Sequence, residues 1–302
     1  MTPIVLLLLF SLAWMVAAAW GPGSHLEFAH RVYRRRRENL PAGVADLLEA
    51  HTAAWQYGNI AADIINFKAV GGHYNHCHRW TIVEDMRALA ETPAEQAFIL
   101  GYLAHLAADT IAHNHFVPYH LARYARTKGF GHLYWEMSAD RFVPEERWKV
   151  VSALKADPEL DALDELVNRT VPRKALSMGT NKLLFSHVLL VSEREQWRRG
   201  VQRIHPIEKL SLRKGFLERF REAAVKRIVL ALSPHGIERL AHVDTNGKAA
   251  QRAAMQARNR LLDRLRPGRV REERSKELAA PFLLGMESPP RSNGRAPEPH
   301  WN

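Results

Sequence analysis

Histidines and carboxylates recur at helical spacing in two parts of this 302-residue sequence. His105, Asp109 and His113 are spaced four residues apart, and so are His132 and Glu136. Because residues four apart lie on one face of an α-helix, each set predicts a polar stripe. The Leu, Ala and Ile residues around the first stripe predict a buried helix, where carboxylates and imidazoles are costly unless they are paired or bind metal. Nitrogen and oxygen ligands without cysteine suit a catalytic zinc ion.

A single histidine–carboxylate pair at this spacing is more often a hydrogen-bonded core pair than a metal site. Here there are two such pairs, and two further features lie upstream of them. One is Asp63, in an apolar helical stretch, and the other is a loop with the histidines His73, His76 and His78. Together these residues favour a metal site over isolated core pairs.

The elements that must position these residues are predicted to be helices, since no run of alternating β-branched residues indicates a sheet. We expect helices over residues 25–36, 41–51, 53–67, 81–89, 93–113, 132–142, 181–190, 212–233 and 248–265. The stretch that begins at Pro93 is apolar on most faces, as is typical of a central helix in a bundle. The predicted fold is therefore all-α, a multi-helix bundle with the metal site between helices.

Composition divides the chain into four predicted parts. Residues 1–19 are apolar and end in Ala17-Ala18-Ala19, which fits a signal peptide and predicts export to a secreted or periplasmic location. Their first residues carry no Lys or Arg, so an uncleaved membrane anchor remains an alternative. We assign residues 20–172 to the helical domain, 173–266 to a basic helical extension, and the proline-containing residues 267–302 to a disordered tail.

The charge of the chain is strongly basic, with a formal net charge of +11 and a pI near 10.0. Such a balance favours anionic partners such as phospholipid headgroups or nucleic acid, although arginine-rich proteomes also produce it without a partner. The chain has 1 cysteine, Cys77, which excludes an intrachain disulfide.

Five segments, in order along residues 20–145, resemble the zinc-dependent phospholipase C family, all-α enzymes with three zinc ions that are related to single-strand-specific zinc nucleases. Each segment is weak by itself, but their order and spacing together are specific. They are Trp20 to His25, Ala61-Ala62-Asp63, His76 to Trp80, His105-x3-Asp109 with His113 or His115, and Gly131-His132-x3-Glu136.

The resemblance implies three sets of ligands. One zinc ion is expected at Asp63, His105 and either His76 or His78, and the nearby Trp80 favours His78. Cleavage after Ala19 would free the amine and carbonyl of Trp20 to bind a second ion with His25, with Asp109 bridging the two. The third ion is expected at His132, Glu136 and either His113 or His115. Straight-helix geometry favours His113, whereas the spacing in the family favours His115.

The resemblance also implies the chemistry. A zinc-activated water would attack a phosphodiester, with Asp63 and Asp109 as the catalytic carboxylates. Phospholipid, cleaved as by a phospholipase C, is the expected substrate, and contact with a membrane surface is an expected interaction. One alternative is a zinc-dependent nuclease or nucleotidase of the same fold, with nucleic acid as substrate. Another is a non-catalytic metal-binding envelope protein, anchored in the membrane if the N-terminal segment is not cleaved.

Overall fold

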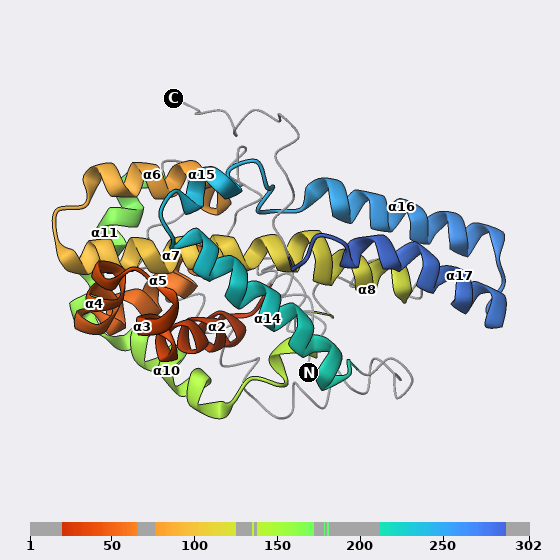
Figure 1. Ribbon diagram of the computed structural model, residues 1–302, viewed down its shortest axis with the longest axis horizontal. Coiled ribbons are helices and arrows are strands. Elements are labelled where there is room, and N and C mark those ends of the chain that lie inside the picture. The colour runs from red at the N-terminus through yellow and green to blue at the C-terminus, as the bar shows by residue number, and fades with distance from the viewer. Residues whose placement is uncertain are drawn as a thin grey trace, which may run out of the picture.

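The computed structural model describes residues 20–65, 76–124, 135, 138–171, 178, 180 and 212–287, and these contain helices and no strand (Figure 1). The prediction of an all-α fold is therefore confirmed. The α-helices are α2 (Pro22–Arg34), α3 (Arg36–Asn39), α4 (Ala42–Ala50), α5 (Thr52–Ile64), α6 (Trp80–Leu89), α7 (Pro93–Ile111), α8 (Val117–Arg123), α10 (Glu145–Ala156), α11 (Asp161–Thr170), α14 (Lys214–Ala231), α15 (Gly236–Leu240), α16 (Lys248–Arg264) and α17 (Arg269–Ala279). Short turns of other helix types are η1 (His76–His78), η2 (Ala112–Phe116), η3 (Pro158–Leu160) and η5 (Ala280–Leu283).

Helix α7 is the central element of the molecule. It begins at a capping box in which Thr92 and Glu95 satisfy each other's backbone N–H groups, with Pro93 in its first turn. From Ala97 to Ile111 almost every residue is buried, because small and aliphatic side chains occupy all of its faces. Helices α2, α5, α6 and α14 pack around it (Figure 1).

Helices α5 and α7 approach each other closely at two glycines. A Cβ atom at Gly101 would lie 3.0 Å from the Cα atom of Gly58 and still closer to the carbonyl oxygen of Trp55. A Cβ atom at Gly58 would overlap the carbonyl oxygen of Phe98 in the same way. These two glycines let the backbones touch, which brings the C-terminal end of α5 beside the middle of α7.

The regular α-helix ends earlier than the sequence predicts. We expected one helix from residue 93 to residue 113, but α7 ends at Ile111 and is followed by η2, a π-helical turn. Pro118, in the first turn of α8, has no N–H group to continue the α-helical hydrogen bonds. The assumption of a straight helix through His113 was therefore wrong, and His113 and His115 both lie in the wider π turn.

The described C-terminal helices share one hydrophobic core with the N-terminal ones, and this core includes both Trp20 and Met286. Helix α14 crosses α7, while α16 and α17 form an antiparallel pair that packs on α8 and projects from the body of the molecule (Figure 1). The prediction of disorder from residue 267 was wrong over residues 269–283. The prolines near the C-terminus dominate the composition there, but Ser275 and Ala279 are buried as α17 packs against its neighbours.

No helix in the described part of the chain is long and apolar enough to span a membrane. The predicted signal peptide and the predicted helix over 181–190 lie outside the described residues, and so do residues 132–134, 136 and 137 of the one over 132–142.

Candidate metal centre

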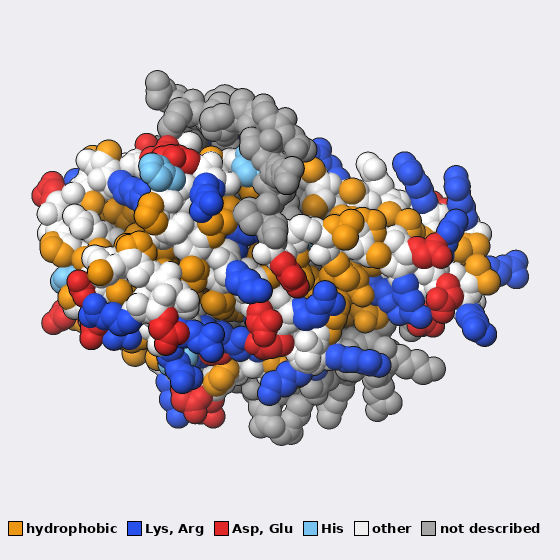
Figure 2. Space-filling model, viewed as in Figure 1, with side chains coloured by type: hydrophobic (Ala, Val, Ile, Leu, Met, Phe, Trp, Pro, Cys, Tyr) orange, Lys and Arg blue, Asp and Glu red, His pale blue; other side chains and the backbone are white. Residues whose placement is uncertain are grey.

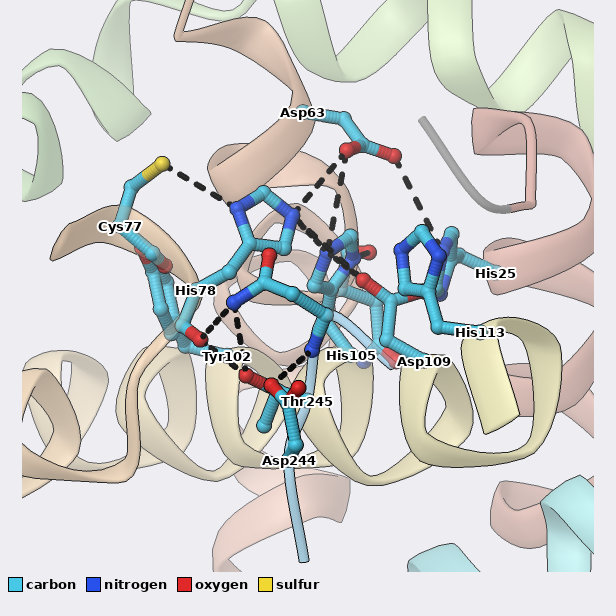
Figure 3. Close-up of polar contacts among 12 residues, drawn as sticks. His25, Asp63, Cys77, His78, Tyr102, His105, Asp109, His113, Asp244 and Thr245 are labelled. Atoms are coloured by element: carbon cyan, nitrogen blue, oxygen red, sulfur yellow. Dashed lines mark hydrogen bonds and ion pairs between the residues drawn. The ribbon is translucent and has the colours of Figure 1, made fainter. Parts of the chain in front are cut away.

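Five of the predicted ligands converge on one buried point (Figure 3). His25 comes from α2, Asp63 from the end of α5, His78 from η1, and His105 and Asp109 from α7. Each of these residues is no more than 5% exposed to solvent. Four elements that are far apart in the sequence thus place three imidazoles and two carboxylates together in the interior.

Asp109 lies at the centre of this group. Its Oδ2 atom is 3.2 Å from Nε2 of His105 and 3.4 Å from Nε2 of His78, while its Oδ1 atom is 3.4 Å from Nε2 of His25. Asp63 faces the same imidazoles, at 3.5 Å from His78 and 3.8 Å from His25. All three imidazoles therefore direct the same nitrogen at the two carboxylates.

Two overlapping sets of residues have the spacing of a metal site. They are His25, His105 and Asp109, and Asp63, His78 and His105, and within each set the ligand atoms lie within 4.8 Å of one another. His105 belongs to both sets. The set Asp63, His78 and His105 has the side chains expected for the first zinc ion, and the other set shares His25 and Asp109 with those expected for the second, without Trp20.

The backbone orients His105 for metal binding. Its Nδ1 atom donates to the carbonyl oxygen of Asn59 at 3.0 Å, since a carbonyl can only accept. The lone pair of the neutral ring then lies on Nε2, which faces the carboxylates. This arrangement is typical of histidines that bind metal, in which the second nitrogen is held by a carbonyl or carboxylate.

The charges of the centre are strongly coupled. Burial alone would raise the pKa of Asp109, but the imidazoles of His105 and His25 hold it well below its usual range. Burial, together with His105, lowers the pKa of His25, so that its neutral form is favoured. An ionised Asp109 beside a neutral His25 is the protonation state in which these two groups bind a divalent cation.

Several polar atoms of the centre are arranged as a bound cation would require. Both oxygens of Asp109 and both ring nitrogens of His25 are buried, yet none of them forms a well-aligned hydrogen bond with the described residues. Buried polar atoms in native structures almost always have a bonding partner, and a cation between these four atoms would provide one. Zinc takes nitrogen and oxygen ligands of this kind. The residues therefore fit zinc.

The remaining predicted side-chain ligands belong to neither set or lie outside the described residues. His113 and His115 belong to neither of the two sets; His113 contacts Gln251, and His115 contacts the carbonyl oxygen of Phe282. His132, Glu136 and the side chain of His76 lie outside the described residues. The third zinc site and the choice between His76 and His78 therefore stay predictions, although it is His78 that faces Asp63 and Asp109.

The N-terminal end of α2 is fixed by contacts that the sequence did not predict. The indole of Trp20 is fully buried and stacks on Phe116 with 4.6 Å between ring centroids. The hydroxyl of Ser24 donates to Asp140 at 2.5 Å, and burial raises the pKa of Asp140 to about 7. These contacts hold the turn that carries His25.

A second set of unpredicted contacts comes from the loop between α15 and α16. The hydroxyl of Thr245 donates to the carbonyl oxygen of His78, and the indole N–H of Trp80 donates to the carbonyl oxygen of Val243 at 3.0 Å. More than 160 residues separate the partners in each pair. No local spacing could have indicated these contacts.

The fold and site thus define a helical protein with a buried histidine–aspartate centre suited to zinc. A family model described as zinc dependent phospholipase C matches residues 24–177, which is more than half of the chain. The chain belongs to this family, as its resemblance to it predicted. No curated protein and no solved structure gave a match.

Proposed function

We propose that this protein is a zinc-dependent phosphodiester hydrolase that cleaves phospholipid in the manner of a phospholipase C. The observation that carries the proposal is the buried group of His25, Asp63, His78, His105 and Asp109, which lies inside the segment that matches the family. Its geometry and its family point to the same chemistry.

In this mechanism Asp63, His78 and His105 would hold one ion, and His25, His105 and Asp109 would hold another. Bound zinc supplies acidification of a water molecule and stabilisation of negative charge on phosphate oxygens. Within the described part of the chain two carboxylates, Asp63 and Asp109, face these positions, so two divalent ions would leave a net positive charge that would attract an anionic diester. The buried walls exclude bulk water, which strengthens this attraction.

The rest of the chain keeps the ligands in place. The carbonyl oxygen of Asn59 fixes the ring of His105. The hydroxyl of Tyr102 donates to the carbonyl oxygen of Cys77, directly before His78. Ligands held in this way need little reorganisation during the reaction.

We also propose export and contact with a membrane surface, as the sequence predicts. The support for membrane contact is the pair of helices α16 and α17, whose projecting end exposes the arginines Arg260, Arg264, Arg266 and Arg269. Figure 2 shows Lys and Arg side chains gathered at that end of the molecule. Anionic headgroups attract such clusters.

The proposal is tested by measuring the zinc content of the protein and the substrates that it hydrolyses. Protein purified from a secreting host is analysed by mass spectrometry for zinc, alongside the variants Asp109→Asn and Asp85→Asn, the second of which changes an exposed residue of α6. We expect bound zinc in the wild type and in Asp85→Asn, and at least one ion fewer in Asp109→Asn. Hydrolysis of phosphatidylcholine vesicles is compared with hydrolysis of single-stranded DNA and RNA.

Release of a phosphorylated headgroup supports the proposal. Cleavage of nucleic acid alone would assign the nuclease alternative instead. Bound zinc without hydrolysis of either substrate would favour a non-catalytic metal-binding protein, and absence of zinc from the wild type would contradict the metal centre itself.

A further inference from the structure

The turn that carries His78 is short, and contacts with other elements must hold it. His105 and Asp109 lie in a helix of 19 residues, but His78 is the last residue of η1, which has 3 residues. A 3₁₀ turn of this length forms few hydrogen bonds of its own. The hydroxyl of Tyr102 donates to the carbonyl oxygen of Cys77 and so holds the middle of the turn. The carbonyl oxygen of His78 is held from another side.

The loop between α15 and α16 holds the end of this turn. The hydroxyl of Thr245 donates to the carbonyl oxygen of His78. Two residues further on, the indole N–H of Trp80 donates to the carbonyl oxygen of Val243 at 3.0 Å. Thr245 is 0% exposed, so water does not compete for its hydrogen bond. The amide nitrogen of Asn246 is 3.5 Å from the same oxygen of His78, beyond the usual range of hydrogen-bond lengths, so Thr245 makes the stronger contact.

The same loop is anchored on its other side. The carbonyl oxygen of Asp244 accepts from the amide of Asn114, in the π turn, at 2.7 Å. Gly247 has a φ of 55°, and a Cβ atom there would overlap the carbonyl oxygen of His113, so glycine allows this close approach. The carboxylate of Asp244 accepts from the backbone N–H of Lys248, the first residue of α16, at 2.9 Å. A loop fixed to η2 and α16 in this way can act as a rigid support for η1.

We propose that Thr245 is a positioning residue that holds His78 where its imidazole binds zinc. The inference rests on the metal centre of the proposed function, but not on its substrate. Nε2 of His78 is 3.5 Å from Asp63 and 3.4 Å from Asp109, and the imidazole moves with the backbone of its own residue. Ligands must be held to within about 0.5 Å of the binding geometry, so a small shift of this backbone weakens the site. Thr245 lies beyond residues 24–177, so the segment matched by the family does not supply this contact.

Substitutions at two buried threonines test this role in the full-length protein. Thr245→Val keeps the shape of the side chain but removes the hydroxyl, whereas Thr245→Ser keeps the hydroxyl. Thr170→Val is the matched control, because the hydroxyl of Thr170 is also buried and also donates to a backbone carbonyl. Its acceptor is Leu166 at 2.8 Å, in a helix that carries none of the five ligands. Circular dichroism checks that each variant is folded, and Thr245→Ala takes the place of Thr245→Val if the latter does not fold.

The affinity of the centre for zinc and the geometry of its ligands are measured in each variant. Competition with a chelator gives the zinc affinity, and the absorption spectrum of the cobalt-substituted protein reports the arrangement of the ligands. We expect one zinc ion to bind roughly 10- to 100-fold more weakly in Thr245→Val, with a changed cobalt spectrum. We expect Thr245→Ser to retain most of the wild-type affinity and the wild-type spectrum. Thr170→Val is expected to unfold at a lower urea concentration but to keep the affinity and the spectrum of the wild type.

The results that contradict the role of Thr245 differ from those that contradict the proposed function. Unchanged zinc affinity and an unchanged cobalt spectrum in Thr245→Val overturn the inference, and so does an equal loss of affinity in Thr170→Val. A loss in Thr245→Ser as large as that in Thr245→Val shows that the hydroxyl does not position His78. A wild type that binds no zinc contradicts the metal centre and this inference with it. If the wild type binds zinc and the affinities differ as expected, but no phospholipid is cleaved, the proposed substrate fails while the role of Thr245 stands.

Discussion

At the scale of single residues, His120 is a buried imidazole outside the metal centre. Its Nδ1 atom donates to the carbonyl oxygen of Phe116 at 2.7 Å, and its ring packs 4.3 Å from that of Trp135. Burial lowers the pKa of His120 from 6.5 to about 3. Between these values the unfolded chain binds a proton that the folded protein does not, so stability falls as the pH decreases from about 6.5 to about 3, by at most about 1.4 kcal/mol per pH unit.

The variant His120→Asn removes the titrating group and keeps an amide N–H group near the position of Nδ1. We expect lower stability than the wild type at pH 7, because ring contacts are lost, but a smaller further loss between pH 7 and pH 5. Urea unfolding at several pH values measures this, with His235→Asn, a change at an exposed site, as the control. Parallel loss of stability in His120→Asn and the wild type would show that His120 does not contribute to acid sensitivity.

The residues of the centre differ in how far the sequence could predict them. His105 and Asp109 follow from helical spacing alone, since one helix carries both. His25 comes from another element, and only the resemblance to a family indicated it. The loop that carries His78 was visible in the sequence, but it offered three histidines. The contact between His113 and Gln251 joins residues that are 138 positions apart in the sequence. Such a contact follows from packing and leaves no local pattern.

At the scale of elements, the contact of α5 with α7 decides whether Asp63 reaches the centre. We expect Gly101→Ala to lower the free energy of unfolding by at least about 2 kcal/mol, since the added methyl group meets backbone that cannot move aside easily. Separation of the two helices also moves Asp63 away from His105, which predicts weaker zinc binding. Chemical unfolding and chelator competition measure the two effects.

Gly215→Ala is the matched control for this variant. Gly215 lies in the first turn of α14, and a Cβ atom there would contact nothing within 4 Å. Alanine is the better helix former, so we expect unchanged or slightly higher stability and unchanged zinc affinity. If Gly101→Ala behaved like this control, the close approach of α5 and α7 would not be what positions Asp63.

The helices themselves were largely predictable, because apolar periodicity and capping residues mark them. The predicted helix over 248–265 and the observed helix Lys248–Arg264 differ by one residue at the end. The expected ranges did not include α8, α10, α11, α15 or α17, and they did not include the π turn. Two of these omissions have a clear physical reason. The π turn Ala112–Phe116 arises where α7 meets a proline-containing helix, and α17 is stabilised by packing on α8 that its charged sequence does not indicate.

At the scale of the whole molecule, residues beyond the family segment complete the protein. We predicted a basic extension over residues 173–266, and its described part contributes α14 to the core and the Thr245 contact to the backbone of His78. Composition alone could not show this, because α14 and α16 are rich in arginine and lysine and bury only one face each. Helices α14 and α16 therefore pack one face against the core and expose charged side chains on the other.

The exposed charge predicts a membrane-binding end. Four exposed arginines lie around the turn between α16 and α17, next to Val270, which is 70% exposed. We expect the double variant Arg266→Glu and Arg269→Glu to bind vesicles that contain anionic lipid roughly 30-fold or more weakly, since each basic residue near such a surface contributes about 1 kcal/mol. Vesicle sedimentation at several salt concentrations measures this.

A double variant with the same change in net charge separates the effect of this end from that of the whole protein. Lys149→Glu and Lys226→Glu alter exposed lysines of α10 and α14, away from the turn. If the proposal is right, this control binds vesicles nearly as well as the wild type, and both double variants hydrolyse a soluble short-chain phospholipid at the wild-type rate, because neither touches the metal centre. Equal weakening of vesicle binding in the two double variants would mean that net charge, rather than the end of the α16–α17 pair, attracts the membrane.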